Sequence, residues 1–441
     1  MSGRAERPVP LFRQPQFRSF FAAHIVSQFG DRVSELAFPL LAVLVLDATP
    51  AQVSVLTALV WLPNLTGLFL GAWVDRRAHK KWLLVTADLI RAALLVTVPV
   101  AFAFDAGTLA QLYAVALLTG AASVLFNTTY PAFFVLLVDR SRYLDANSAL
   151  SASRSVSFIA GPALGGVLVQ VLTAPVAILV DAVSFVASAL GIGRIRLADA
   201  ARTGRPDDDA PGTLWHRARD GLRFTLRDPV LRAGLGCATT VNYFSFVFSA
   251  LLVLFASRTL GLPSGLLGLA LGAGAVGGLL GAVVAPRLSA RIGVGRSIVA
   301  GAVVFPASIS FVAVADGPLW ARVGLLGAAE FFSGFGVMLF DVNLNALNAA
   351  VIPDGLRSRV AGAYSTINYG VRPLGALTGG ALGTWLGLRP TLWIAAVGGV
   401  LCVVWLLPSP IPKVRSLDHL GDPDHPRPDL TEVGAARGGD E

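Results

Sequence analysis

Four polar side chains recur along an apolar stretch near the start of the chain: His24, Gln28, Asp31 and Glu35. Their spacings of four, three and four residues place them on one face of a helix. An ionisable side chain inside an apolar helix is costly and usually functional. Two carboxylates in such a place can take up a proton and release it, so Asp31 and Glu35 are candidates for proton coupling.

A structural role for Asp31 is the alternative. In that case its carboxylate pairs with Arg32 or Arg154 and holds helices together. Burial raises the pKa of a carboxyl group in general, whereas a neighbouring arginine lowers it. Under the functional interpretation, proton loading and discharge depend on which side the surrounding cavity opens to.

A second pair of acids lies in the apolar stretch 320–348. Glu330 and Asp341 are eleven residues apart, about three helical turns, and therefore share a face. They are further candidates for proton coupling. Their plainer interpretation is that they pair helices or extend out of the apolar layer at helix ends.

These side chains need apolar helices to hold them, and the composition is typical of a membrane protein. The 441 residues are 54% hydrophobic and 14% charged, with a mean hydropathy of +0.68. The net charge of +8 comes from bases between apolar stretches and does not indicate nucleic acid. The two cysteines and five histidines form no metal-ligand pattern. We expect no enzyme activity, no metal and no cofactor.

Twelve apolar stretches are long enough to cross a bilayer, which takes about 20 residues each. They lie near 19–46, 51–74, 82–104, 108–137, 147–170, 174–194, 233–257, 264–286, 296–315, 320–348, 360–386 and 389–408. The fold class expected is therefore an all-α membrane protein of twelve transmembrane helices in two six-helix halves.

The domain organisation follows from these stretches. The segments expected are 1–18, an N-terminal half 19–194, a linker 195–232, a C-terminal half 233–408 and a tail 409–441. In the linker, Trp215 to Arg232 alternates apolar residues with arginines, as in a helix lying on the inner leaflet. The tail is polar and proline-rich, and we expect it to be disordered.

Lysines and arginines lie mostly in the loops of one side. Cytoplasmic loops carry this excess in membrane proteins. We therefore expect both termini in the cytoplasm, a multi-pass location in the inner (plasma) membrane, and a monomer in contact with the lipid bilayer.

A short turn between the second and third stretches combines a glycine, an acid and bases: Gly71, Asp75, Arg76 and Lys80. A related run, from Gly281 to Arg287, follows about 210 residues later. A duplicated membrane protein of this kind binds its substrate between the halves, near mid-membrane, and works by alternating access.

This turn and the duplication resemble the major facilitator superfamily over residues 10–410. Two positions depart from that family's loop motif, Ala78 and His79, although the charge pattern survives. Asp88 and Arg91 lie one turn apart just inside the third stretch. The resemblance implies that they lock the Asp75–Arg76 turn on the cytoplasmic side when the cavity faces out.

Further motifs resemble the branch that contains macrolide exporters and the enterobactin exporter. They are Phe17-Arg18-Ser19-Phe20, Ser27-x-x-Gly30-Asp31 with Ala37-x-Pro39, Ala87-Asp88-x-x-Arg91-Ala92, Ala146-Asn147-Ser148, Gly161-Pro162-Ala163-Leu164-Gly165-Gly166 and Asp181-Ala182-x-Ser184-Phe185. In this resemblance Gly161, Pro162, Gly165 and Gly166 form the fifth-helix motif associated with exporters. Close packing of small residues is the plainer explanation.

Polar and aromatic side chains in the stretches are candidates to line a substrate cavity. They are His24, Gln28, Arg32, Asn127, Tyr130, Arg154, Asn242, Tyr243, Tyr369 and Arg372. The function expected is proton-driven export of an amphipathic small molecule: a drug, a macrolide-like metabolite or a siderophore. The alternatives are an importer, a lipid or lysophospholipid flippase, which should have a cavity open sideways between the halves, and a sensor that does not transport.

Overall fold

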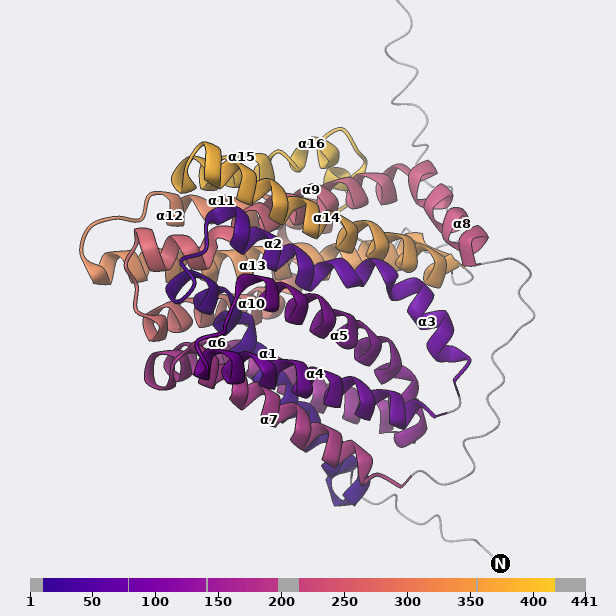
Figure 1. Cartoon of the computed structure of the whole chain (residues 1–441). Helices are drawn as coiled ribbons and strands as arrows, with labels where there is room; N and C mark the ends of the chain where they lie inside the picture. Colours follow the sequence, from indigo (N-terminus) through magenta and orange to yellow (C-terminus); the bar gives the residue numbers. More distant parts are fainter. Residues whose placement is uncertain (1–10, 78, 140–141, 197–213, 354–355, 417–441) are drawn as a thin grey trace, which may run out of the picture.

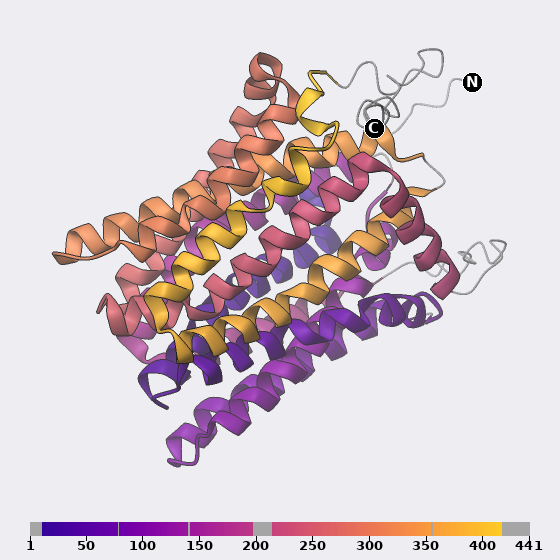
Figure 2. The same cartoon turned by 90° about the horizontal axis from the view of Figure 1, so that it is seen from above.

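The computed structural model describes residues 11–77, 79–139, 142–196, 214–353 and 356–416. Within these ranges all regular structure is helical and no β-strand occurs. Figure 1 shows long helices packed side by side, and Figure 2 shows the same bundle turned by 90°. The all-helical expectation is confirmed for these residues.

The first part of the bundle precedes residue 197. Its helices are α1 (Pro15–Leu44), α2 (Pro50–Trp61), η2 (Leu62–Thr66), α3 (Gly67–Asp75), α4 (Lys80–Ala103), α5 (Leu109–Leu137), α6 (Tyr143–Leu172) and α7 (Ala174–Gly193), with a short turn η1 (Leu11–Arg13) before α1. They correspond to the six apolar stretches expected there, with the second stretch divided into three pieces.

The second part follows residue 213. Its helices are α8 (Leu214–Arg227), α9 (Pro229–Leu254), η5 (Phe255–Thr259), α10 (Ser264–Ile292), α11 (Val294–Ala307), α12 (Ile309–Ala313), α13 (Leu319–Val351), α14 (Arg357–Trp385), α15 (Leu388–Val400), α16 (Val403–Leu406) and η7 (Ile411–Lys413). The order again follows the apolar stretches, after the amphipathic α8.

Nine of the described helical segments are long and apolar enough to cross a membrane. The first, second and eleventh expected stretches are not among them. α1 carries Asp31, Arg32 and Glu35, α14 carries Arg372, and η2 with Pro63 interrupts the second stretch. The helices that fall short in hydropathy or length therefore include those with candidate functional residues.

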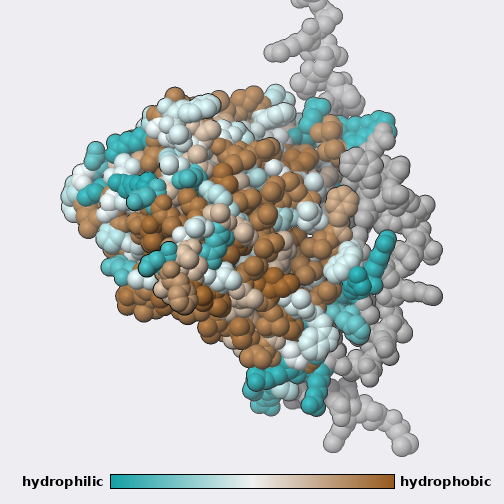
Figure 3. Space-filling view, viewed as in Figure 1, coloured by the Kyte–Doolittle hydropathy of each residue, from teal (hydrophilic) through white to brown (hydrophobic). Residues whose placement is uncertain are grey.

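The outer surface is apolar around its middle. Figure 3 shows a broad area of hydrophobic side chains with hydrophilic ones gathered toward the two ends. Val183 of α7, Leu269 of α10 and Val397 of α15 are among the exposed apolar side chains. A surface of this kind is expected where a protein contacts lipid. Apolar side chains face the hydrocarbon there, and helices satisfy their backbone polar groups internally.

Two connections have the same unusual backbone in equivalent places. Thr173, between α6 and α7, has φ 79° and ψ 158°, and Gly387, between α14 and α15, has φ 90° and ψ 166°. A positive φ is uncommon for threonine. The same backbone also occurs at Gly293, between α10 and α11 (φ 94°, ψ 153°), so it marks tight helix–helix connections in general and is not specific to the duplication.

The two parts of the bundle meet most closely where α6 packs on α10. Gly166 lies against the backbone of Ser264 and Gly268, and Gly268 lies against the carbonyl of Pro162. A side chain at either glycine would collide with the opposite backbone. Small residues thus allow α6 and α10 to approach at backbone contact distance.

A second contact between the parts joins α2 to α14. Gly380 lies against Ser54 and Ala51, and Gly383 lies against Pro50. These contacts involve the beginning of α2 and the last third of α14. They lie at the same end of the bundle as the α6–α10 contact, because α2 begins and α6 ends there.

Toward the opposite end, α6 separates from α10. Ser151 and Arg154, in the first half of α6, are exposed. The corresponding part of α10 packs on α13 instead, with Gly277 against Phe331 and Gly281 against Phe335. The bundle is therefore closed at one end of the α6–α10 pair and open at the other.

The linker and the tail differ from expectation. The amphipathic helix ends at Arg227 instead of Arg232, because Asp228 caps a new helix and accepts hydrogen bonds from the backbone N–H groups of Val230 (2.9 Å) and Leu231 (3.0 Å). Pro229 then starts α9, as prolines often do. Residues 197–213 of the linker lie outside the described part.

The expectation of disorder from residue 409 onward is wrong for the start of the tail. Ile411 is fully buried, and the N–H of Gly295 donates to the carbonyl of Val414 at 2.9 Å. Residues 409–416 pack on the turn between α10 and α11 because Ile411 is apolar enough to join the core there. Residues 417–441 lie outside the described part.

Candidate functional site

Arg91 of α4 lies at the centre of a charged cluster. Its Nη1 is 3.7 Å from Oδ1 of Asp31 on α1, and its Nη2 donates to Oδ1 of Asp88, one turn earlier on α4. The guanidinium also lies over the rings of Phe126 (4.8 Å) and Phe185 (4.0 Å). Two carboxylates and two aromatic faces together offset the cost of burying this positive charge.

The two carboxylates beside Arg91 differ in access to solvent. The side chain of Asp88 is 0% exposed, whereas that of Asp31 is 46% exposed. A group that exchanges protons with water needs such access. Asp31 therefore combines a charged partner with an open side, which Asp88 lacks.

The ion pairs that the structural alternative named for Asp31 do not form. Its partner is Arg91 on a neighbouring helix, not Arg32 or Arg154. Arg32 Nη1 instead donates to Glu35 Oε2 at 2.5 Å, one turn along α1, where the Glu35 side chain is 62% exposed. The cause is the orientation of α1, which directs Asp31 toward α4 and Arg32 toward α6.

A third acid close to α1 was not among the candidate residues. Asp181 of α7 is buried and accepts hydrogen bonds from the hydroxyl of Ser34 on α1 and from that of Ser184 at 3.1 Å. Gly30 lies against the same carboxylate. An acid inside the apolar stretch 174–194 is the sequence signal that could have identified Asp181 as a candidate.

The first half of the polar stripe on α1 packs on α5. His24 is buried and shares a hydrogen bond with Gln28, and its ring stacks on that of Tyr130 with centroids 5.1 Å apart. The hydroxyl oxygen of Tyr130 is buried with no hydrogen-bond partner in the described part of the chain. His24 therefore hydrogen-bonds to Gln28 on α1 and stacks on Tyr130 of α5. Asn127, also on α5, is exposed.

The glycine-rich segment of α6 contacts α1 on one side. Gly161 lies against the side chain of Arg32, and Gly165 lies against the backbone of Val33. Arg32 also lies over the ring of Phe158 at 3.9 Å. Together with Gly166, which contacts α10, this segment joins α1 to the other part of the bundle.

A pocket between α1 and α6 opens beside this segment. It has a volume of about 430 Å³ and is lined mainly by apolar side chains. The lining residues are Phe12, Phe21, Ile25, Phe29, Ala149, Ala152, Ser153 and Val156. Both walls belong to the first part of the bundle.

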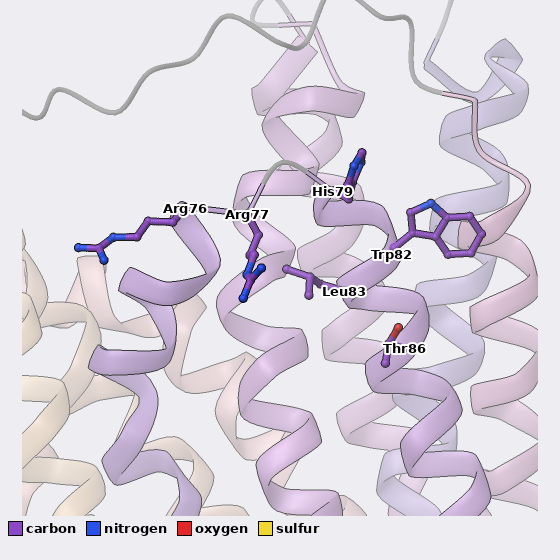
Figure 4. A pocket seen from close by; sticks show the side chains of 6 residues that line it. All are labelled: Arg76, Arg77, His79, Trp82, Leu83 and Thr86. Atoms are coloured by element: carbon purple, nitrogen blue, oxygen red, sulfur yellow. The ribbon is translucent and has the colours of Figure 1, made fainter.

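The turn between α3 and α4 forms a basic pocket of about 300 Å³. Figure 4 shows the side chains that line it: Arg76, Arg77, His79, Trp82, Leu83 and Thr86. Lys80 donates a hydrogen bond back to the carbonyl of Val74, and no atom lies near the place of a side chain at Gly71. The side chain of Asp75 lies outside the described part, so the expected lock between this turn and Asp88–Arg91 stays a prediction.

In the second part, the candidate acids of α13 lie apart from each other. Glu330 is half-buried beside Gly274 of α10, and Asp341 is exposed. No ion pair of either carboxylate is found among the described residues. They share α13 but do not form one site.

The remaining candidates gather where α9 and α14 meet. Asn242 Nδ2 is 3.5 Å from Asn368 Oδ1, and the hydroxyl of Tyr243 donates to that of Thr378 at 2.7 Å. Tyr369 and Arg372 lie on α14 one turn apart. Among the described residues, no group of histidines, cysteines and acids is placed to hold a metal ion.

Comparison with known proteins places the chain in a family. A family model of the major facilitator group, described as transmembrane secretion effector, matches residues 7–440. The chain belongs to this family. The resemblance inferred from the loop motif and the duplication is thereby confirmed, and the family is one of multi-pass membrane transporters, not of enzymes.

Curated relatives cover nearly the whole chain. The multidrug efflux pump Tap of Mycobacterium tuberculosis (strain H37Rv) is 29% identical over 443 aligned positions, covering 96% of this chain and 99% of that protein. The uncharacterized MFS-type transporter YfiS of Bacillus subtilis is 25% identical and covers 90% of this chain and 94% of its own length.

Solved transporter structures share the fold. A mutant of the nucleoside transporter NupG superposes with a TM-score of 0.74 at 11% identity, covering 90% of this chain and 99% of that one. A bacterial homologue of the iron transporter ferroportin in an inward-facing state superposes with a TM-score of 0.68 at 19% identity, covering 90% and 98%. These likenesses concern the fold alone.

Proposed function

We propose that this chain is a secondary active transporter that exports an amphipathic small molecule in exchange for protons. It would cross the inner membrane twelve times as a monomer, with both termini in the cytoplasm. α1, the α2–η2–α3 segment and α14 supply the three spans whose polar or interrupted sequences depart from ordinary membrane helices. The efflux pump among its relatives supports the direction of transport.

The observation that carries the proposal is the cluster around Arg91. A membrane-embedded arginine with two carboxylates, one buried and one 46% exposed, holds a proton-exchangeable group in a defined place. When Asp31 is ionised it attracts Arg91 across the α1–α4 contact. When Asp31 takes up a proton this attraction is lost, while Asp88 keeps Arg91 paired. Proton binding can therefore change how α1 packs without leaving a buried charge unpaired.

The arrangement of the two parts supports alternating access. They touch through α6–α10 and α2–α14 at one end and separate at the other, where the first half of α6 is exposed. In the orientation expected from the positive charges, the open end faces the cytoplasm, from which an exporter takes its substrate. A shift of α1 is transmitted directly to α6, because Gly161 and Gly165 lie against Arg32 and Val33.

Lipid flipping is the alternative on the same fold, and it needs a cavity open sideways between the two halves. The opening between α6 and α10 lies between the two parts, whereas the pocket between α1 and α6 has both walls in the first part. The multidrug efflux pump among the relatives favours export of a small molecule.

The test is a transport assay with Asp31→Asn. An efflux-deficient host expressing the chain should accumulate less of an exported compound from a panel of labelled macrolides, dyes and siderophores, and a protonophore should abolish the difference. Asp31→Asn should still bind that compound but lose uphill export, because amide and protonated acid are alike in charge. Asp145→Asn is the matched control, since Asp145 is an exposed acid at the start of α6. Uphill export at the wild-type rate in Asp31→Asn would contradict the proposal.

A further inference from the structure

Arg372 is surrounded by aromatic rings from both parts of the bundle. Its guanidinium carbon lies 4.4 Å from the ring centroid of Trp61 on α2, 5.1 Å from that of Phe246 on α9 and 4.5 Å from that of Tyr369 on α14. The ring of Trp61 also meets that of Phe246 at 5.3 Å and that of Tyr369 at 6.2 Å. We call these four residues the Arg372 cluster.

The cluster supplies no acceptor for the arginine. Among the described residues Arg372 forms no ion pair and no hydrogen bond, and its Nε is buried without a partner. The acid with which it interacts electrostatically is Asp341 of α13, beyond ion-pair distance. A guanidinium has five N–H donors, and here the aromatic faces satisfy only its charge.

Arg91 provides the contrast within the same molecule. It too lies between aromatic rings, but Asp88 accepts a hydrogen bond from it and Asp31 lies 3.7 Å away. Two carboxylates therefore balance its charge. Arg372 has the rings without the carboxylates. Burying the Nε–H of Arg372 without an acceptor is costly, and the remaining N–H groups form no hydrogen bond with the described residues and can donate to a bound anion.

The cluster lies where the two parts of the bundle meet. All four side chains are partly exposed, and they come from helices of both parts, near the α2–α14 contact. Aromatic rings around a cation form a wall on which a flat apolar body can stack. Free N–H donors beside that wall recognise a carboxylate, sulfonate or phosphate group, for which a guanidinium is well shaped.

We propose that the Arg372 cluster binds the anionic group of the transported molecule, and that this transporter therefore prefers anionic amphipathic substrates with an apolar or aromatic body. The inference rests on the proposed function and adds the charge class of its substrate. The same chemistry could be supplied by the phosphate of an anionic lipid headgroup, and the experiment separates the two sources.

The experiment measures binding to the purified full-length protein in nanodiscs of neutral lipid. The probes are pyrenebutyrate and pyrenebutylammonium, which share one aromatic body and differ in charge. Wild-type protein should bind the anion at least tenfold more tightly than the cation. Arg372→Gln should weaken binding of the anion about tenfold to a hundredfold, as expected for loss of charge-assisted hydrogen bonds, and leave that of the cation unchanged. Arg372→Lys should keep the preference for the anion at reduced affinity.

Arg389→Gln is the matched control. Arg389 is a second arginine of the same part of the bundle that lies near an aromatic ring, at 6.0 Å from Phe255, but it has an acidic partner in Asp316. It should bind both probes as the wild type does. Equal affinity of the wild type for the two probes, or unchanged binding of the anion to Arg372→Gln, would overturn the inference.

Nanodiscs containing phosphatidylglycerol distinguish the source of the anion. If this lipid displaces pyrenebutyrate from the wild type, the cluster takes an anionic headgroup; if not, it takes a free anion. Both results support an anion site. The assay contains no proton gradient, so failure of uphill export would count against the proposed function alone, and loss of the charge preference would count against this inference alone.

Discussion

At the scale of single residues, two polar contacts join α1 to neighbouring helices, in addition to the ion pairs formed within single helices. Arg91 pairs with Asp31 across the α1–α4 contact, and Asp181 accepts from Ser34 across the α1–α7 contact. α1 thus contributes the partly exposed Asp31 to one contact and binds the buried Asp181 through Ser34 in the other. The buried acid is expected to stabilise the bundle, and the exposed one to change its charge during transport.

Replacing Asp181 tests this division of roles. Asp181→Ala leaves the hydroxyls of Ser34 and Ser184 without their acceptor, which costs about 1–3 kcal/mol for a buried group. We expect a lower unfolding temperature for the purified protein, measured by intrinsic fluorescence or by size-exclusion chromatography after heating. Asp145→Ala, an exposed acid, should unfold at the wild-type temperature. An unchanged midpoint for Asp181→Ala would show that these hydrogen bonds do not hold α1 to α7.

At the scale of elements, α6 connects α1 to the second half. One side of its glycine-rich segment contacts Arg32 and Val33 of α1, and Gly166 contacts Gly268 of α10. The segment that resembles an exporter motif is therefore a junction of three helices. Its glycines are required by close approach of backbones and not by unusual dihedral angles, since they lie within α6.

Enlarging Gly268 tests the junction. Gly268→Val places a branched side chain against the Pro162 carbonyl, and such overpacking typically costs about 1–3 kcal/mol. We expect α6 and α10 to separate at this end. A disulfide between cysteines introduced by Gln170→Cys and Gly265→Cys, whose parent residues share a 2.9 Å hydrogen bond, should then form more slowly.

The matched control for that experiment is Gly362→Val in α14. No atom lies within 4 Å of a side chain built there, so the same change in residue type should leave the cross-linking rate at the wild-type level. Equal rates in Gly268→Val and wild type would mean that α6 and α10 tolerate the larger residue without moving.

At the scale of the whole molecule, the two parts are joined at one end and apart at the other. This asymmetry predicts which side water-soluble reagents reach. A cysteine introduced by Ser151→Cys, at an exposed position of α6, should react with a membrane-impermeant maleimide added from the cytoplasmic side. The native cysteines, Cys237 and Cys402, are buried and give little background.

Ser157→Cys is the internal comparison, because Ser157 is 1% exposed on the same helix. It should react much more slowly. Reaction of Ser151→Cys only from the outer side would reverse the proposed orientation. Addition of an exported substrate together with an inward proton gradient should slow labelling of Ser151→Cys, because the open end closes during the proposed transport cycle.

Much of this architecture is determined by the sequence alone. The apolar stretches predicted where helices run, because a segment in lipid must satisfy its backbone internally. The spacing of Gly71, Asp75 and Arg76 and its repetition identified the family. Spacing along one helix also predicts neighbours on that helix, such as Arg32 with Glu35, since residues three and four apart are adjacent.

Only the tertiary structure shows which helices form ion pairs and hydrogen bonds with one another. The rotation of each helix about its axis and the packing between helices are not encoded by spacing within a single stretch. For that reason the structural alternative for Asp31 named Arg32 and Arg154 instead of Arg91, and Asp181 was seen as part of a motif but not as a candidate site residue. The cluster around Arg372 is the clearest case. Its rings come from residues about 300 positions apart in the chain, at 61 and 369, and they meet only because the second helix of one half packs on the fifth helix of the other.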